Sequence, residues 1–267
     1  MIQPVPTGPA LDLAAVGLVE QGTVVLRDVT WTAARDERWV VLGPNGSGKT
    51  SILRLVSFQR APSSGVVTVL GHRYGTVDVR TARRRIGLAS SALLQRLRPT
   101  LTAHEAVVTG RDAALEPWWS TYSEADHQRA DALLGWVGCA GHVGQELATL
   151  SEGERKRVLV ARLLMADPEL LLFDEPCAGL DLGGRESLVA LLGELARTGE
   201  RPLVMVTHHL EEIPPGFTHA LLLRSGEVVA AGPISATLSS DAVSDTFGVA
   251  VTVDSDGTRW TARVSAL

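Results

Sequence analysis

The sequence predicts an α/β fold built around a phosphate-binding loop. A glycine-rich stretch, Gly43 to Thr50, lies between an apolar run typical of a strand and a segment with helical spacing. Two later apolar runs end in polar residues, at Asp174 and at His208. Between these parts, Thr100 to Thr149 has helical periodicity, which predicts an inserted group of helices.

The glycine-rich stretch has the sequence G-P-N-G-S-G-K-T, after the strand Trp39 to Leu42 and before the helix Ser51 to Phe58. Its glycines let successive N–H groups turn toward an anion, and the following helix adds the positive end of its dipole. Lys49 is expected to reach the β- and γ-phosphates, and Thr50 to ligate Mg²⁺. The predicted nucleotide contacts here are Gly43, Pro44, Asn45, Gly46, Ser47, Gly48, Lys49, Thr50 and Ser51.

Length and composition limit the other possibilities. The 267 residues are 45% hydrophobic, enough for one large domain with subdomains, and the net charge of −5 gives no basic excess for a long nucleic-acid interface. Cys139 and Cys177 lack metal-ligand spacing and are expected to be reduced. No uninterrupted apolar stretch approaches the ~20 residues that span a bilayer, so a membrane role would need a partner. Met1 to Ala10, with three prolines and no cation, is predicted to be a loose tail without a secretory signal.

The first half of the chain reads as short strands around the loop. Leu11 to Gly17 and Thr23 to Leu26 predict an antiparallel pair. Val66 to Leu70 predicts a further strand, and Ile86 to Ala89 a short buried one. Gly71 to Arg85, between them, is polar and is expected to be irregular.

Two segments have two open interpretations. The triple arginine Arg83-Arg84-Arg85 fits a solvated turn, or a contact with phosphates or an acidic partner. Glu116-Pro117-Trp118-Trp119 fits local packing within the helices, or a docking surface for another protein.

The second half of the chain contributes further anion-binding and acidic groups. Leu150 to Glu154 reads L-S-E-G-E at a helix start, where Ser151 and Gly153 form an anion-accepting N-terminus. The strand Leu170 to Phe173 ends in two carboxylates. Asp174 is expected to hold Mg²⁺ through water, and Glu175, pointing the other way, to polarise an attacking water.

Two features complete the predicted site. Ala178 to Asp181 is a turn before a helix from Gly184 to Arg197. The strand Leu203 to Val206 is followed by Thr207 and His208. A histidine at a strand end of an α/β sheet lies where ligands gather, which favours a role in the site.

From about Leu11 to Gly232, these motifs in this order resemble the ATP-binding subunit of ATP-binding-cassette (ABC) proteins. Asp181 is similar to a residue of the family's D-loop, and His208 to its switch histidine. The resemblance implies a head-to-tail dimer with ATP between the phosphate loop of one subunit and the signature loop of the other. Ser151 and Gly153 would contact the γ-phosphate across the interface, Asp181 would also lie near nucleotide, and a homodimer is the simplest arrangement.

The resemblance implies a Mg²⁺-dependent ATPase on the cytoplasmic face of the cell membrane, driving transport through a separate multi-spanning permease. Glu175 would be the base, with Lys49 and His208 on the phosphates. An alternative is a non-transport ABC ATPase acting on nucleic acid or the ribosome, which the acidic balance disfavours, so no nucleic-acid partner is expected. A phosphate-loop kinase or GTPase would have no use for the Leu150 to Glu154 motif.

The chain departs from the family pattern at three places. Glu152 and Glu154 replace glycine and glutamine in the signature, adding negative charge near the phosphates. Serine at about Ser91 replaces the glutamine expected after the Ile86 strand, with Gln95 a few residues on. The aromatic that stacks on adenine falls near Gln21, so weak stacking and a broad nucleotide preference are expected.

The predicted division is a tail at 1–10, an ABC ATPase domain at 11–232 with a helical subdomain at about 92–165, and a C-terminal extension at 233–267. Strands at Val249 to Val253 and Thr258 to Val264, around the Asp256-Gly257 turn, predict a terminal hairpin. This tail is similar to the tails of importer subunits for metal, siderophore or cobalamin, and the run Thr207 to Pro214 resembles a molybdate-transport-like subgroup. Together they imply a molybdate and iron-siderophore importer-like subgroup.

Overall fold

The computed structural model describes residues 8–199 and 201–264. The first seven residues of the predicted tail, Met1 to Ala10, therefore lie outside the described residues. Its last residue, Ala10, is buried and donates its N–H to the Ala33 carbonyl at 2.8 Å, so Ala10 packs against the main fold.

A six-stranded sheet carries the fold, and all its neighbouring strands are parallel except the antiparallel pair β9 and β10. In the register, Leu42 lies opposite Thr207, and Asp174 lies opposite both Val206 and Ser90. The carboxyl ends of four strands therefore meet at one edge. The sheet order is β10-β9-β3-β8-β7-β6, with β3 (Arg38–Leu42), β6 (Ile86–Ser90), β7 (Leu170–Asp174), β8 (Leu203–Thr207), β9 (His219–Arg224) and β10 (Glu227–Pro233).

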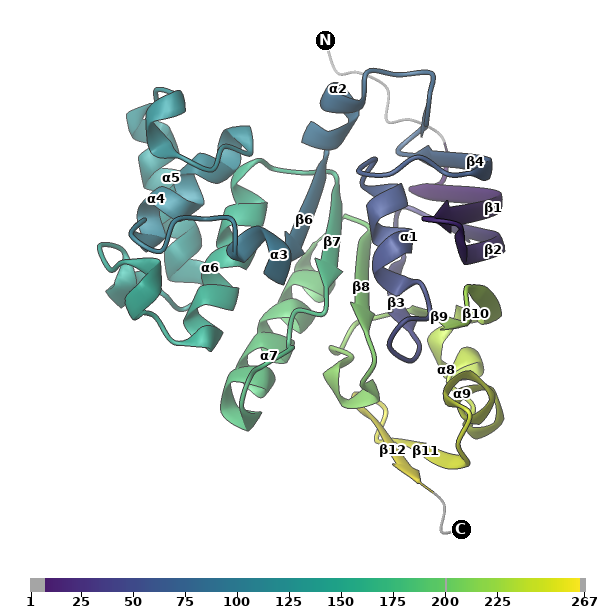
Figure 1. The fold of residues 1–267 in the computed structure, drawn as a ribbon. Coiled ribbons are helices and arrows are strands. Elements are labelled where there is room, and N and C mark those ends of the chain that lie inside the picture. The colour runs from purple at the N-terminus through teal and green to yellow at the C-terminus, as the bar shows by residue number, and fades with distance from the viewer. Residues whose placement is uncertain (1–7, 200, 265–267) are drawn as a thin grey trace.

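A smaller antiparallel sheet covers one face, with helix α1 (Lys49–Val56) between the two sheets (Figure 1). Alternate residues of β3 face different cores: Trp39 and Val41 pack with α1 and the small sheet, whereas Val40 and Leu42 pack with the helices opposite. The predicted antiparallel pair is confirmed, but its second strand continues past Leu26 to Ala33. The order is β2-β1-β4-β5, with β1 (Leu11–Glu20), β2 (Thr23–Ala33), β4 (Ser64–Val69) and β5 (His72–Arg73).

Helices fill the other face and extend beyond the β6 edge, where α4, α5 and α6 pack together (Figure 1). The helices are α3 (Ser91–Leu94), α4 (Ala103–Val108), α5 (Glu124–Trp136), α6 (Glu152–Met165) and α7 (Leu182–Thr198). Within the described residues, four 3-10 turns lie between these helices and a fifth follows β8: η1 (Thr109–Asp112), η2 (Pro117–Trp119), η3 (Ala140–His142), η4 (Leu147–Thr149) and, after β8, η5 (Leu210–Glu212).

The C-terminal part contains the predicted hairpin, which is confirmed as β11 (Val251–Ser255) paired with β12 (Trp260–Val264). It follows two short helices, α8 (Ile234–Thr237) and α9 (Ser240–Phe247). Arg259 donates to Glu186 of α7 at 2.7 Å and fixes the hairpin to the main fold.

The prediction of an irregular segment from Gly71 to Arg85 is wrong. It contains β5 and a helix, α2 (Val79–Arg84), because the Asp78 carboxylate caps the helix by accepting from the Arg80 N–H at 3.1 Å. Two of the three consecutive arginines make internal contacts: Arg83 donates to the Phe58 carbonyl and Arg85 to Glu169.

The Glu116 segment packs locally, because Glu116 pairs with Arg98, whose guanidinium lies 4.9 Å from the Trp118 ring centroid. The Trp118 side chain is nevertheless 61% exposed. Docking of another protein here stays a prediction.

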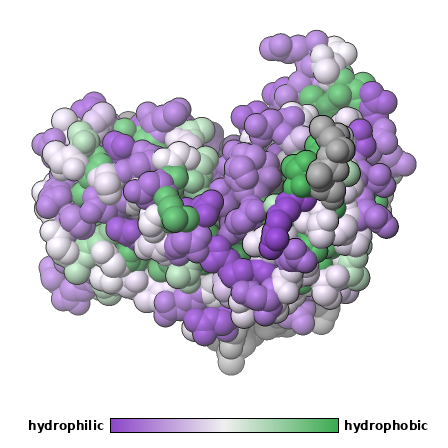
Figure 2. Space-filling view, turned by 90° about the horizontal axis from the view of Figure 1, so that it is seen from below, coloured by the Kyte–Doolittle hydropathy of each residue, from purple (hydrophilic) through white to green (hydrophobic). Residues whose placement is uncertain are grey.

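Within the part of the chain that the structure describes, no helix is both long enough and apolar enough to cross a bilayer. The arrows of β6, β7 and β8 point down in Figure 1, so Figure 2, seen from below, shows the face on which these strands end. Hydrophilic residues predominate on that face, and hydrophobic residues form small groups.

A buried arginine holds the helical group together and gives a test of the fold. Arg162 of α6 is only 4% exposed and donates to the Ala106 carbonyl, the Thr109 hydroxyl and the Ala114 carbonyl at 2.5–2.6 Å. Burial lowers the pKa of Arg162 to about 10. Its three bonds join α6 to α4 and to the chain beyond η1.

We expect Arg162→Met to lower the free energy of unfolding by about 3 kcal/mol, because it removes a charged donor and leaves buried acceptors unpaired. Urea denaturation measures this change. The control is Arg129→Met, which removes an exposed arginine paired with Asp167 at 3.4 Å and should cost less than about 1 kcal/mol. Equal losses in the two variants would contradict the role of Arg162.

Candidate functional site

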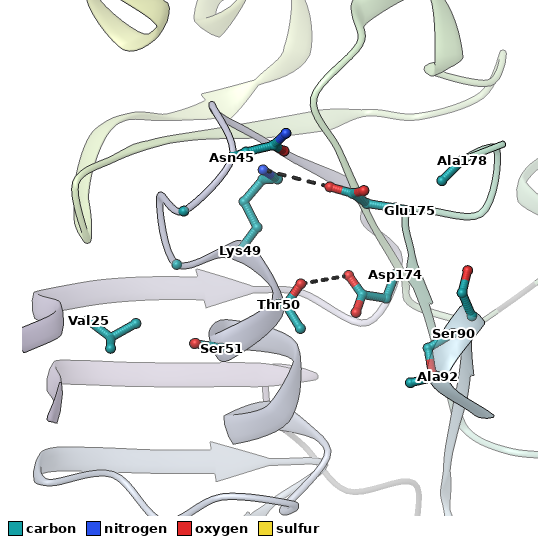
Figure 3. A pocket seen from close by; sticks show the side chains of 13 residues that line it. Val25, Asn45, Lys49, Thr50, Ser51, Ser90, Ala92, Asp174, Glu175 and Ala178 are labelled. Carbon is teal, nitrogen blue, oxygen red and sulfur yellow. Dashed lines mark hydrogen bonds and ion pairs between the residues drawn. The ribbon is translucent and has the colours of Figure 1, made fainter. Parts of the chain in front are cut away.

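A cavity of about 520 Å³ opens where the central strands end. Figure 3 shows its lining side chains, which come from the glycine-rich loop, from the ends of β6 and β7, and from β2. Its lining residues are Val25, Asn45, Gly46, Gly48, Lys49, Thr50, Ser51, Ser90, Ser91, Ala92, Asp174, Glu175 and Ala178.

The loop has the backbone that a phosphate cradle needs. Gly46 and Gly48 have φ angles of 79° and 104°, which favour glycine. A Cβ atom at Gly43 would lie 2.1 Å from the Leu223 carbonyl oxygen, so this position has no room for a side chain. The Ser47 hydroxyl is buried with no hydrogen-bond partner among the described residues, as expected for a group that can bind an anion.

Lys49 is buried and points along the cavity. Its Nζ donates to the carbonyls of Gly43 at 2.8 Å and Pro44 at 3.0 Å, and lies 3.9 Å from a Glu175 oxygen. Burial lowers the pKa of Lys49, and the nearby carboxylates of Glu175 and Asp174 oppose this shift. An anionic phosphate in the cavity would further favour the charged ammonium.

Thr50 and Asp174 form the pair that fits Mg²⁺. The Thr50 hydroxyl donates to Asp174 Oδ1 at 3.0 Å, and burial raises the pKa of Asp174 (Figure 3). The Thr50 hydroxyl and the Asp174 carboxylate offer oxygen atoms, the ligand type that Mg²⁺ prefers, and Asp174 would hold the ion through water. Among the described residues, no group of three or more His, Cys, Asp or Glu side chains could hold a metal ion.

Glu175 corrects one part of the sequence prediction. Strand alternation predicts that it points away from Asp174, but both carboxylates line the same cavity. The alternation does not extend to Glu175, because β7 ends at Asp174 and Glu175 has a left-handed backbone with a φ of 47°. His208 Nδ1 lies 3.2 Å from Glu175 Oε1, and the two residues share a second cavity of about 250 Å³.

Six of the twelve predicted nucleotide contacts do not line the first cavity: Gly43, Pro44 and Ser47 of the loop, and Ser151, Gly153 and Asp181. Ser151 caps α6 by accepting from the Glu154 N–H at 3.3 Å, and its hydroxyl donates to the Glu154 carboxylate at 2.8 Å. Asp181 caps α7 by accepting from the Gly184 N–H at 2.7 Å.

The extra carboxylates of the signature have partners inside the chain. Glu152 accepts from Arg155 at 2.7 Å, and Glu154 lies 3.1 Å from His142. Hydrogen bonds from Ser151 and the charge of His142 lower the pKa of Glu154.

Several lining residues were not predicted from the sequence. Val25 enters from β2, whereas Gln21 lies in the turn between β1 and β2 with a φ of 49°. Ser90 is the last residue of β6 and Ala92 lies in α3 just after it, and the rule that ligands gather at strand ends could have identified them. Ser91 lines the cavity, but Gln95 does not.

Comparisons with known proteins identify the family of this chain. The family model described as ABC transporter matches residues 26–178. The Bacillus subtilis (strain 168) protein named "Uncharacterized ABC transporter ATP-binding protein YlmA" is 40% identical over 245 residues, covering 91% of this chain and 92% of that protein. A Rhodopseudomonas palustris (strain HaA2) protein named "Phosphonates import ATP-binding protein PhnC 1" is 34% identical, covering 85% and 82%.

Among solved structures, the chain is similar to the dimeric post-hydrolysis ATP-binding cassette MJ0796 bound to ADP and Pi. The TM-score is 0.72 at 25% identity, covering 84% of this chain and 98% of that one. The predicted fold class, an α/β phosphate-loop core with an antiparallel subdomain and inserted helices, is confirmed. The chain belongs to the ABC transporter family, as an ATP-binding and ATP-hydrolysing subunit.

Proposed function

We propose that this ATPase hydrolyses ATP in the cavity around Lys49, with Glu175 as the general base. The observation that carries the proposal is the convergence of Lys49, Thr50, Asp174 and Glu175 on one cavity at the strand ends. The loop N–H groups and Lys49 would bind the phosphates, and the glycines would admit them close to the backbone. Ser51 lines the same cavity and would complete the loop contacts.

The chemical step is the attack of water on the γ-phosphorus. The bond from phosphorus to the β–γ bridging oxygen breaks, ADP leaves, and the water proton passes to the Glu175 carboxylate. His208, 3.2 Å from that carboxylate, would orient it and contact the γ-phosphate. Thr50 and Asp174 would hold Mg²⁺, which when bound supplies positive charge at the phosphate oxygens.

The active form would be a head-to-tail homodimer. Ser151 and Gly153 lie at the N-terminus of α6, an end that can accept an anion, and would contact the nucleotide of a second copy. Asp181, at the N-terminus of α7, would lie in the same interface. The likeness to a dimeric cassette supports this arrangement. ATP binding would close the dimer and hydrolysis would reopen it.

We further propose that residues 11–232 form the ATPase domain, with its helical subdomain at about 92–165 and an extension at 233–267. The subunit would bind a separate membrane permease at the cytoplasmic face of the cell membrane. The molybdate and iron-siderophore grouping stays a prediction. One similar protein whose name includes a cargo is a phosphonate import protein, which does not favour this grouping.

Glu175→Gln tests the base. We expect ATP binding to be retained and kcat to fall about 100-fold or more, because the amide cannot accept the water proton. Phosphate release measures hydrolysis, and equilibrium binding measures affinity. Glu194→Gln, at an exposed position of α7, is the control that should keep normal turnover. Turnover in Glu175→Gln equal to that of the wild type would contradict the assignment.

Ser151→Arg tests the dimer. Introduced into the Glu175→Gln protein, it should abolish ATP-dependent dimerisation by placing a long side chain where the partner's γ-phosphate would lie. Light scattering after size-exclusion chromatography measures the mass. The control is Ser239→Arg, which replaces the N-cap serine of α9 and so removes a helix cap as Ser151→Arg does. It should leave dimerisation unchanged. Dimers of the Ser151→Arg protein would overturn the head-to-tail arrangement.

The membrane partner is tested by cross-linking native membranes in the presence of ATP and the Glu175→Gln protein, followed by pull-down. We expect a multi-spanning membrane protein to be recovered, and less of it with the added Ser151→Arg change. Recovery of ribosomes, DNA or soluble protein alone would reject the permease while leaving the ATPase assignment intact.

A further inference from the structure

The chain contains 23 arginines but only two lysines, Lys49 and Lys156. Both lysine side chains lie in residues that are 4% exposed, and burial lowers the pKa of each. Burying an ammonium costs free energy, so a buried lysine is expected to have a specific binding partner. Lys49 has one in the phosphate loop, whereas the function proposed above does not use Lys156.

Lys156 connects α6 to the nucleotide cavity. Its Nζ donates to the Ser91 hydroxyl at 2.7 Å, joining residues 65 positions apart in the chain. Ser91 lines the cavity together with Asp174 and Glu175. It also lines a neighbouring groove with Glu152 and Arg155, at the start of α6.

The hydrogen bond has a consequence for Ser91. A serine hydroxyl has one O–H donor and two acceptor lone pairs. Because the ammonium of Lys156 occupies a lone pair of Ser91, the O–H is left to donate, and no described residue accepts from it. Donation from a cation polarises the hydroxyl and makes it a stronger donor. In this cavity its acceptor would be a phosphate oxygen or the attacking water.

We propose that Lys156 is a positioning residue for ATP hydrolysis, which holds the Ser91 hydroxyl toward the nucleotide and ties α6 to that cavity. Because α6 begins at the capping residue Ser151, one hydrogen bond joins a chain's own nucleotide site to the helix that would meet its partner's nucleotide. The serine and the lysine act as one unit where the family pattern has a glutamine at the Ser91 position. This inference rests on the proposed ATPase site.

The two lysines allow a test that does not depend on turnover. The full-length Glu175→Gln protein is labelled with ¹³C at the Cε atom of lysine, so its ¹³C NMR spectrum contains two side-chain signals. The signal that disappears in Lys156→Gln belongs to Lys156. We expect Mg²⁺-ATP to move both signals, and Ser91→Ala to suppress the movement of the Lys156 signal only. A moving Lys49 signal beside an unchanged Lys156 signal would overturn this inference alone. If neither signal moves, the proposed nucleotide site itself fails.

Kinetics of the wild-type background give the second test. We expect Ser91→Ala and Lys156→Met each to lower kcat about tenfold, the size of one hydrogen bond to a charged group, with KM for ATP changed less than about threefold. The double variant should be no slower than either single one, because both remove the same interaction. Lys156→Gln, which keeps an N–H donor, should recover part of the loss.

The matched control is Ser187→Ala. Ser187 of α7 also accepts from a cation of α6, Arg157, at 3.3 Å, but it does not line the nucleotide cavity. Its kcat should stay within about twofold of the wild type. Normal kcat in Ser91→Ala, additive losses in the double variant, or an equal loss in Ser187→Ala would each overturn the proposal. Thermal unfolding of each variant identifies any that fail to fold, and Ser91→Ala then carries the test.

Discussion

The register of the parallel strands is the constraint on which the site depends. Asp174 lies opposite both Ser90 and Val206, and Leu42 lies opposite Thr207. This alignment brings four loops to one edge, although they are far apart in the chain. A shift of one residue in any pairing would turn the side chains of that strand to the other face and remove both the core packing and the cavity. The strand pairing that forms the sheet therefore also forms the site.

The charged groups that line this cavity, the ammonium of Lys49 and the carboxylates of Asp174 and Glu175, suit an anion bound together with a cation. The Lys49 ammonium donates to two carbonyls and lies 3.9 Å from Glu175. Burial lowers the pKa of Lys49 and raises the pKa of Asp174, so it favours the neutral form of each group. Phosphate oxygens and Mg²⁺ would favour the charged forms of both groups. Ligand binding would thus relieve the cost of burying them, which gives the closed, nucleotide-bound state an energetic advantage over the empty one.

Two buried cations of α6 have different consequences. Arg162 donates to backbone and hydroxyl oxygens within the helical group, so it stabilises that group as a unit. Lys156 donates to Ser91 at the edge of the sheet, so it links the unit to the nucleotide cavity. Both cations are on one helix, which also packs in a shared hydrophobic core with the sheet and α7. Helix α6 therefore contacts both the helical group and the edge of the nucleotide cavity.

The phosphate loop, the order of the motifs and the α/β class could be predicted from the sequence, because they depend on neighbouring residues and on hydrophobic periodicity. The sequence did not determine that Glu175 turns into the cavity beside Asp174, which follows from a left-handed backbone just past the end of β7. Nor did it determine that Val25 lines the cavity or that Lys156 reaches Ser91. Only the tertiary structure decided these contacts, because strand register and helix packing bring together residues that no local pattern relates.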